Sequence, residues 1–156
     1  MKPEDRELLL KDLCPRLPYN VWVSYKTKYD DIERATILNG NYIRDIMEGT
    51  SSWIDFKPYL RPMSSMTEEE ARDIAILHGY DETEILFVKV MKEHIEVTLL
   101  DDFYYPIIST IRYDDIISSI KCFDYLNKKM FDFRGLIPKG HALSTEEHNP
   151  YLLNNK

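Results

Sequence analysis

Apolar and polar residues alternate along residues 19–26, and this period of two predicts a β-strand with one buried face. Val21 and Val23 lie on the predicted buried face, which places Trp22 on the opposite one. The dipeptide Asn39-Gly40 is typical of two-residue hairpin turns, because both turn positions favour positive φ. Alternation and β-branched content predict further short strands at residues 32–38, 42–47 and 53–59.

Helices are predicted from the signals at their ends. Residues 4–13 follow Pro3, which suits the first turn of a helix. Residues 68–78 begin with a capping box formed by Thr67 and Glu70. The rest of the pattern predicts strands at residues 85–90, 95–100 and 104–112, a longer helix capped by Asp114, and an irregular tail after Gly135.

These elements predict an α+β protein built from two small segments. Residues 1–62 are expected to form an N-terminal helix and a four-stranded SH3-like barrel or curved antiparallel sheet. Residues 63–156 are expected to form a helix, three antiparallel strands, a second helix and the tail. The stretch 61–66 is the best linker between them, and the alternative is one compact domain made of both halves.

The net charge of the chain and its distribution argue against some classes of function. The 156 residues carry a formal charge of -7, and all of the excess acidity lies in residues 63–156, since residues 1–62 hold ten basic and ten acidic residues. Proteins that bind duplex DNA through its phosphates present a basic face, so we expect no duplex nucleic-acid binding. No apolar run approaches the roughly 20 residues that span a bilayer, and the N-terminus has no apolar signal core. We therefore expect a cytoplasmic protein without membrane contact.

Candidate chemistry is sparse. The two cysteines, Cys14 and Cys122, form no ligand spacing with each other or with the four histidines, so no metal is predicted. No nucleophile elbow, phosphate-binding loop or dinucleotide fingerprint is present, so no catalytic residue and no cofactor is assigned. The acidic pair Asp101-Asp102 precedes three aromatic residues, 103–105, and is best interpreted as a turn.

Aromatic residues are the more informative feature, with 11 Tyr, six Phe and two Trp. Most are expected in the core, but any exposed member is a candidate contact for a partner. The candidates on the first predicted strands are Trp22, Tyr25, Tyr42 and Trp53. Of the two tryptophans, Trp22 is expected to be the more accessible, because it opposes the apolar face. A small anionic ligand would require a local cationic pocket, for which the candidates are Arg34, Arg44, Arg61 and Arg112.

Three stretches of the chain carry a resemblance. They are KDLCPRLPY at residues 11–19, KPYLRPMSSMTEEE at 57–70 and FDFRGLIPKG at 131–140. Together they resemble a family of uncharacterised proteins of gut anaerobic bacteria and their phages and prophages. The resemblance implies no activity and no site residue. It implies a context, namely an accessory protein of a bacterial or phage genome that acts in the cytoplasm.

The sequence thus favours a non-catalytic accessory or regulatory protein that works by binding. One alternative is a phage host-defence antagonist that sequesters a nucleotide signal or covers a host protein. A second alternative is a small hydrolytic enzyme. The expected partner is a protein or a small anionic ligand, and the oligomeric state is left open.

Overall fold

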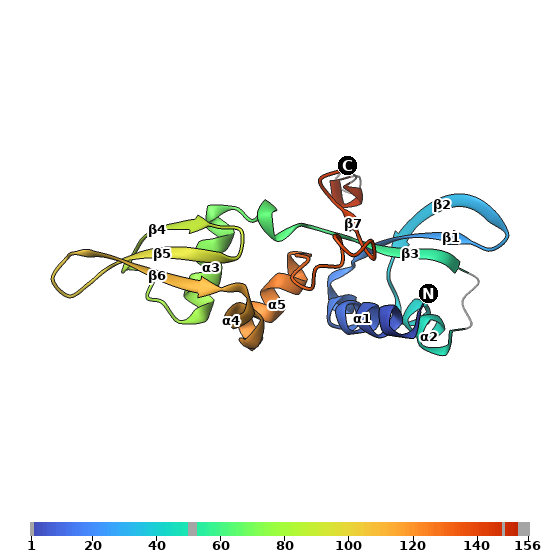
Figure 1. Cartoon of the computed structure of the whole chain (residues 1–156), viewed down its shortest axis with the longest axis horizontal. Coiled ribbons are helices and arrows are strands. Elements are labelled where there is room, and N and C mark those ends of the chain that lie inside the picture. The colour runs from blue at the N-terminus through green and yellow to red at the C-terminus, as the bar shows by residue number, and fades with distance from the viewer. Residues whose placement is uncertain (1, 50–52, 148, 153–156) are drawn as a thin grey trace. The chain divides into compact units, whose positions relative to one another are not determined.

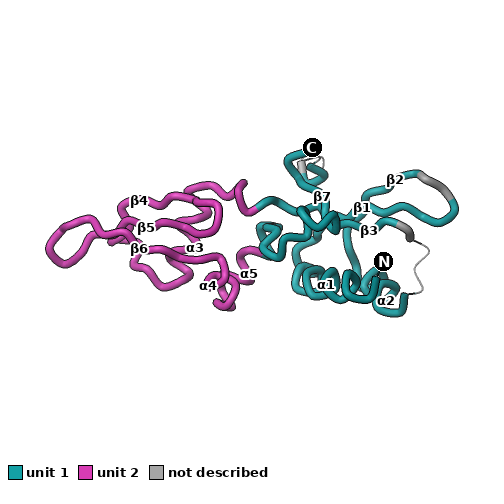
Figure 2. The backbone as a smooth tube through the Cα atoms, viewed as in Figure 1, with its two compact units in different colours: residues 1–62, 127–156 teal, residues 63–126 magenta. Residues whose placement is uncertain are grey.

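The computed structural model describes residues 2–49, 53–147 and 149–152, and over these residues the chain has a mixed α+β fold (Figure 1). This confirms the predicted fold class. The described residues form two sheets and no closed barrel, and only three strands of the first sheet come from residues 1–62. The chain divides into two compact units (Figure 2): unit 1 comprises residues 1–62 and 127–156, and unit 2 comprises residues 63–126. The division after Pro62 lies at the expected boundary, but residues 127–156 belong to unit 1 rather than to the second segment.

Unit 1 combines helices with an open four-stranded sheet in the order β2-β1-β3-β7. The strand β1 pairs antiparallel with both β2 and β3, and β7 pairs parallel with β3. The fourth strand therefore comes from the tail. The elements are α1 (Pro3–Leu13), a 3₁₀ segment (Cys14–Tyr19), β1 (Trp22–Thr27), β2 (Asp30–Ile37), α2 (Gly40–Glu48), β3 (Trp53–Leu60), β7 (Leu143–Ser144) and a 3₁₀ turn (Pro150–Leu152).

The predicted hairpin at Asn39-Gly40 and the strand at residues 42–47 are wrong, because the chain forms α2 there. Asn39 acts as the N-cap: its side chain accepts hydrogen bonds from the backbone N–H groups of Asn41, at 3.0 Å, and Tyr42, at 3.4 Å. Ile43 and Ile46 are three residues apart and both are buried, which is a helical spacing. The helix ends at Gly49, whose φ of 66° suits a left-handed C-terminal cap.

The core of unit 1 joins both ends of the chain. Side chains from α1, α2 and the strands pack with residues of the C-terminal segment. The segment is therefore a part of the fold rather than a loose tail. The buried apolar members are Leu9, Leu13, Val21, Val23, Leu38, Ile43, Ile46, Phe56, Leu60, Met130, Leu136 and Ala142.

Unit 2 contains a three-stranded antiparallel sheet in the order β4-β5-β6. The predicted capping box is confirmed, since Thr67 Oγ1 accepts from the Glu70 N–H and the Glu70 carboxylate accepts from the Thr67 N–H. The elements are a 3₁₀ turn (Met63–Ser65), α3 (Glu68–His78), β4 (Ile85–Val90), β5 (His94–Leu100), β6 (Pro106–Arg112), α4 (Tyr113–Ser118) and α5 (Ile120–Lys128), whose last two residues are counted in unit 1.

The long helix predicted after Asp114 is two helices. Ser119 has an extended backbone, with φ of -82° and ψ of 121°, and it separates α4 from α5. Arg112 rather than Asp114 occupies the N-cap position. Ile116 of α4 is buried, whereas Ile120, the first residue of α5, is 85% exposed.

The two faces of the β4-β5-β6 sheet differ. Along one face lie the cross-strand rows Val90–Ile95–Ile111 and Val88–Val97–Ser109, and α3 packs against β4. The hydroxyl of Tyr80, just after α3, bonds the Ser109 hydroxyl on this face. The opposite face, which we call the open face, carries the rows Phe87–Thr98–Ile108, Lys89–Glu96–Thr110 and His94–Arg112.

A β-bulge lies at the start of β4. Two residues, Leu86 and Phe87, follow Ile85 where β5 advances by a single residue from Leu99 to Thr98. Arg72 of α3 donates through Nη1 to the Ile85 carbonyl and through Nη2 to the Leu86 carbonyl, each at 3.2 Å. The bulge is thus fixed by the helix beneath it, and it leaves Leu86 and Phe87 exposed.

Candidate functional site

Two of the predicted aromatic contacts pack within unit 1. The ring centroids of Tyr25 and Tyr42 lie 6.1 Å apart, and the Tyr42 ring lies 6.1 Å from the ring of buried Phe56. Both tyrosines are partly buried and pack against the core of unit 1. Their positions are explained by packing.

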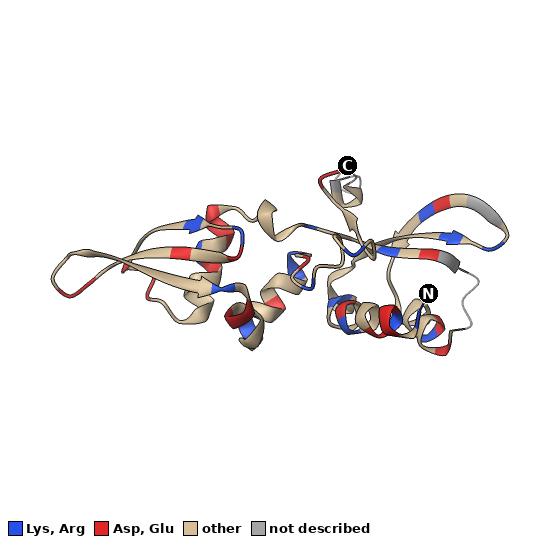
Figure 3. Ribbon diagram, in the orientation of Figure 1, with Lys and Arg blue, Asp and Glu red and all other residues tan. Residues whose placement is uncertain are grey.

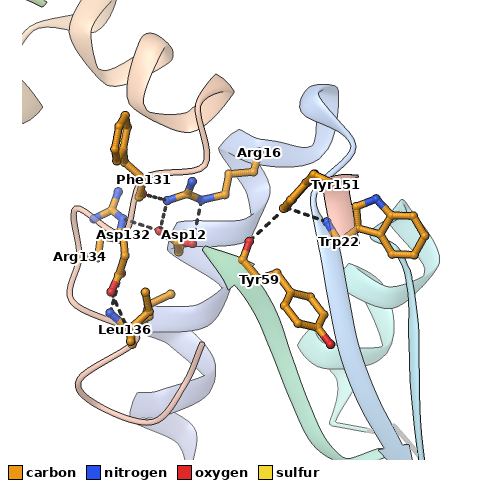
Figure 4. Close-up of polar contacts among 10 residues, drawn as sticks. Asp12, Arg16, Trp22, Tyr59, Phe131, Asp132, Arg134, Leu136 and Tyr151 are labelled. Atoms are coloured by element: carbon orange, nitrogen blue, oxygen red, sulfur yellow. Dashed lines mark hydrogen bonds and ion pairs between the residues drawn. The ribbon is translucent and has the colours of Figure 1, made fainter. Parts of the chain in front are cut away.

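The two tryptophans differ from these tyrosines. Trp22 is partly buried on β1, and its backbone N–H donates to the Tyr151 hydroxyl at 3.1 Å. Figure 4 shows its indole ring directed away from that hydroxyl. The side chain of Trp53 lies outside the described residues.

The four predicted arginines belong to different elements and make different local contacts. Arg34 on β2 donates to a backbone carbonyl at 3.3 Å, and Arg44 on α2 lies 3.7 Å from the carboxylate of the next residue. The guanidinium of Arg61 lies over the Phe131 ring, 4.3 Å from its centroid. Arg112 belongs to unit 2, where it lines a cavity.

A buried polar cluster fastens the C-terminal segment to α1 (Figure 4). Arg16 donates through Nε and Nη2 to the two carboxylate oxygens of Asp12, each at 2.9 Å, and Nη2 also donates to the Phe131 carbonyl at 2.7 Å. The side chains of Asp12 and Arg16 are fully buried. An ion pair with no exposed surface cannot touch a ligand, so the role of this pair is structural.

Asp132 has the environment of a candidate general acid, since burial raises the pKa of its carboxyl. Its two oxygens are, however, both occupied. One accepts from the Leu136 N–H at 2.7 Å and the other from the Ile137 N–H at 2.8 Å, and these bonds act on the pKa in the opposite direction. The carboxyl therefore closes the turn after it and is not placed to exchange a proton with a substrate.

Tyr151 provides a second set of hydrogen bonds between the C-terminal segment and the sheet of unit 1. Its hydroxyl donates to the Tyr59 carbonyl at 3.0 Å and accepts from the Trp22 N–H (Figure 4). Burial raises the pKa of Tyr151 to about 12, so the phenol is neutral over the physiological range. One hydroxyl thus ties the chain end to β1 and β3.

Unit 2 carries the most exposed aromatic group of the described residues, the loop between β5 and β6. We call residues 101–105 the aromatic loop. The side chains of Phe103, Tyr104 and Tyr105 are 79%, 83% and 69% exposed. Phe87 and Ile108, on the adjoining open face, are also exposed. Exposed apolar groups that gather at one place mark interaction sites more often than single ones do.

The aromatic loop is internally ordered. One carboxylate oxygen of Asp101 accepts from the N–H groups of Phe103, at 3.0 Å, and Tyr105, at 2.7 Å. The Asp101 backbone bonds back to Tyr104 and Tyr105. Tyr104 has a φ of 62°, a left-handed conformation that costs roughly 1–2 kcal/mol for a residue with a Cβ. The loop holds three rings in water in a fixed turn.

Acidic residues lie at the same end of the sheet as the aromatic loop, and the adjacent stretches of the chain contain no Lys or Arg. Leu100, which precedes the loop, bonds to the carbonyl of Glu84, so the acidic stretch that ends there lies at the same end of the sheet. Unit 2 holds five Lys or Arg and 14 Asp or Glu, a net charge of -9, against +2 for unit 1 (Figure 3). No Lys or Arg occurs in residues 73–88 or 97–111. The five carboxylates at this end are Asp81, Glu82, Glu84, Asp101 and Asp102.

Sequence reasoning recognised the turn at Asp101 but missed the site. The Asp101 hydrogen bonds confirm the turn. The signal for a site was the aromatic triplet itself, because three consecutive rings in a turn cannot all be buried. The exposure of Phe87 and Ile108 depends on the bulge and on the strand register, which the sequence does not display.

The opposite end of the same sheet carries a cavity of about 680 Å³. The β4–β5 hairpin, the end of β6 and the start of α4 line it. This is the cavity that contains Arg112. Within the described residues, no group of three or more His, Cys, Asp or Glu is placed to hold a metal ion.

None of the helices in the described part of the chain combines the length and the apolar character that a membrane crossing requires. Comparisons of the chain with protein-family models, with curated proteins and with solved structures found no match.

Proposed function

We propose that the chain is a non-catalytic binding protein that contacts a protein partner through the aromatic loop, together with Phe87 and Ile108 of the open face. The observation that carries this proposal is the ordered display of three exposed rings. We further propose an accessory or regulatory role in the cytoplasm of a bacterial host, encoded by the bacterium or its phage. The resemblance of the three sequence stretches motivates that context.

The energetics support a role for the loop beyond folding. The left-handed backbone of Tyr104 is unfavourable, and its ring gains nothing from burial within this chain. Burial of apolar surface in a partner returns about 25 cal/mol for each Å², and aromatic side chains dominate binding energies at interfaces. A fixed turn also reduces the conformational entropy lost on binding.

The charge around the loop favours a partner with a basic surface. Five carboxylates belong to the same end of the sheet as the rings, and the adjacent stretches contain no Lys or Arg. A second copy of the chain is disfavoured as the occupant, because two such ends facing each other would bring ten carboxylates together. A basic surface with an apolar pocket would bury the rings and pair with the carboxylates.

The test immobilises the full-length protein and passes bacterial extract over it. The double variant Phe103→Ala/Tyr105→Ala should lose at least about 90% of the retained partner, since central aromatic residues dominate interface energies. Tyr29→Ala is the matched control, because Tyr29 is a tyrosine of unit 1 that is also largely exposed. The retained protein should carry a basic surface, and its retention should fall as salt rises.

Equal retention by the double variant and the wild type would overturn the proposal, and so would the absence of any retained protein. Sedimentation of the purified chain provides a further check. Self-association that depends on Phe103 and Tyr105 would show that the aromatic loop binds a second copy of the chain and not a basic partner.

A further inference from the structure

The cavity at the hairpin end of unit 2 concentrates cations in an otherwise acidic unit. Three of the five Lys or Arg of unit 2, namely Lys89, Lys92 and Arg112, lie in or beside it. His94 faces Arg112 directly across the β5–β6 ladder and also lines the cavity. Carboxylates also lie at this end of the sheet, since Glu93 and Asp114 line the cavity, but the loop end carries no Lys or Arg.

The two cationic side chains that line the cavity, Lys92 and Arg112, are available to bind a ligand. The side chains of Lys92 and Arg112 make no hydrogen bond or ion pair with any residue that the structure describes, and both are exposed. By contrast, the lone cation of α3, Arg72, is occupied by backbone carbonyls. Thr110 adds a hydroxyl to the same cavity. Two free cations and a hydroxyl around one hollow are suited to an anion with several oxygens.

Hydrogen bonds hold the backbone around the cavity in place. The Tyr113 hydroxyl donates to the Met91 carbonyl at 2.7 Å, and the Tyr113 N–H donates to the Glu93 carbonyl at 3.4 Å. These bonds hold the β4–β5 hairpin against the start of α4. The backbone on both sides of the cavity is therefore positioned before any ligand arrives, which lowers the entropy cost of binding.

The acidic residues that line the cavity favour a ligand with hydroxyl or amino groups in addition to an anionic group. Glu93 and Asp114 also line the cavity, and carboxylates repel a bare anion but accept hydrogen bonds from hydroxyl and amino groups. The volume of about 680 Å³ falls within the usual range for small-molecule sites and exceeds what an isolated phosphate ion fills.

We propose that this cavity binds a phosphate monoester of a sugar or nucleoside. The phosphate lies between Lys92 and Arg112, and the hydroxyl or amino groups of the remainder bond to Glu93 and Asp114. The proposal does not depend on the aromatic loop, because the two sites share no residue.

Calorimetric titration of the full-length protein tests this site. The probes are AMP and ribose 5-phosphate, each paired with its unphosphorylated counterpart, and inorganic phosphate. We expect at least one monoester to bind with a dissociation constant below about 1 mM, and its counterpart and inorganic phosphate to bind at least about tenfold more weakly. The absence of such binding for both monoesters would overturn the proposal.

Variants locate the binding. Arg112→Gln and Lys92→Gln should each weaken the monoester at least about tenfold, since each removes a charge-assisted hydrogen bond. Lys121→Gln, which removes an exposed lysine of α5 outside the cavity lining, is the matched control and should leave the affinity unchanged. Equal affinity in the Arg112 and Lys92 variants and the control would place the ligand elsewhere and refute the assignment.

Discussion

At the scale of single residues, Tyr104 combines a backbone conformation that lowers the stability of the fold with a ring that is exposed to solvent. Its φ of 62° lies in the left-handed region, where glycine is free of the Cβ penalty. We expect Tyr104→Gly to raise the free energy of unfolding by about 0.5–1 kcal/mol, because the strain outweighs the extra entropy of an unfolded glycine. Urea unfolding followed by circular dichroism measures this change.

The same variant should bind the partner less well, since it removes an exposed ring. A gain in stability together with a loss of binding is the signature of a residue kept for function. Tyr104→Ala is the control, because it removes the ring but keeps the strained Cβ, so it should not stabilise. If Tyr104→Gly destabilised the protein by 1 kcal/mol or more, the ring would have to contribute packing, against its exposure of 83%.

Tyr151 is the residue whose titration should affect stability at alkaline pH. Its folded pKa of about 12 lies above the ordinary value of 10.0, so the folded chain holds a proton that the unfolded chain has lost. Stability from this group is complete below pH 10 and falls as pH rises from 10 to 12, by at most about 2–3 kcal/mol. Tyr151→Phe should flatten this part of the pH profile in thermal melts. An unchanged slope between pH 10 and 12 in Tyr151→Phe would contradict the assignment.

At the scale of elements, α1 and the 3₁₀ segment after it offer two ion pairs of the same i,i+4 spacing in opposite environments. The Asp12–Arg16 pair is fully buried, whereas Glu7 and Lys11 are 71% and 64% exposed. Asp12→Ala should cost about 3–5 kcal/mol of unfolding free energy, because it leaves the Arg16 charge buried without its carboxylate. Glu7→Ala should cost less than about 0.5 kcal/mol.

Chemical denaturation of the two variants compares the pairs directly. Similar losses in both variants would mean that spacing rather than burial determines the energy. The double variant Asp12→Ala/Arg16→Met should recover part of the loss, since a buried ion pair replaced by apolar groups is often close to neutral.

The elements also show how far the sequence determines the fold. The capping box at Thr67 was predictable because its two hydrogen bonds are local. Asn39-Gly40 was misread because asparagine is favoured both in hairpin turns and as an N-cap. The buried Ile43 and Ile46 decide for the helix, and their burial comes from contacts with distant elements.

The candidate sites follow the same division. The aromatic triplet at residues 103–105 and the charge balance can be read from the sequence. The meeting of Lys92 with Arg112 cannot, because it depends on the register that places His94 opposite Arg112. A shift of that register by one residue would carry Arg112 to the opposite face of the sheet.

At the scale of the whole molecule, unit 2 is an insertion in unit 1. The chain leaves unit 1 after Pro62 and returns at residue 127. The Arg61 N–H donates to the Met130 carbonyl at 2.8 Å, and the Asp132 N–H donates to the Arg61 carbonyl at 2.7 Å. The departing and returning segments of the chain are therefore hydrogen-bonded neighbours within unit 1. A domain tolerates the removal of an insertion best when the two ends of the insertion lie close together. The net charge of -9 belongs to the insertion alone.

This arrangement predicts opposite outcomes for two deletions of similar kind. Replacement of residues 63–126 by a short Gly-Ser linker should leave unit 1 folded, because the buried residues that form its hydrophobic core cluster belong to residues 1–62 and 127–156. Truncation after residue 126 should unfold unit 1, because it removes Phe131 from Arg16 and Tyr151 from β1 and β3.

Both tryptophans of the chain, Trp22 and Trp53, belong to unit 1, so tryptophan fluorescence reports on that unit in either deletion. The thermal midpoint should stay within about 5 °C of the full chain for the first deletion, and the second should show no cooperative transition. A cooperative transition in the truncated chain would mean that the C-terminal segment is dispensable, and loss of the transition in the linker variant would mean that unit 1 requires the insertion to fold.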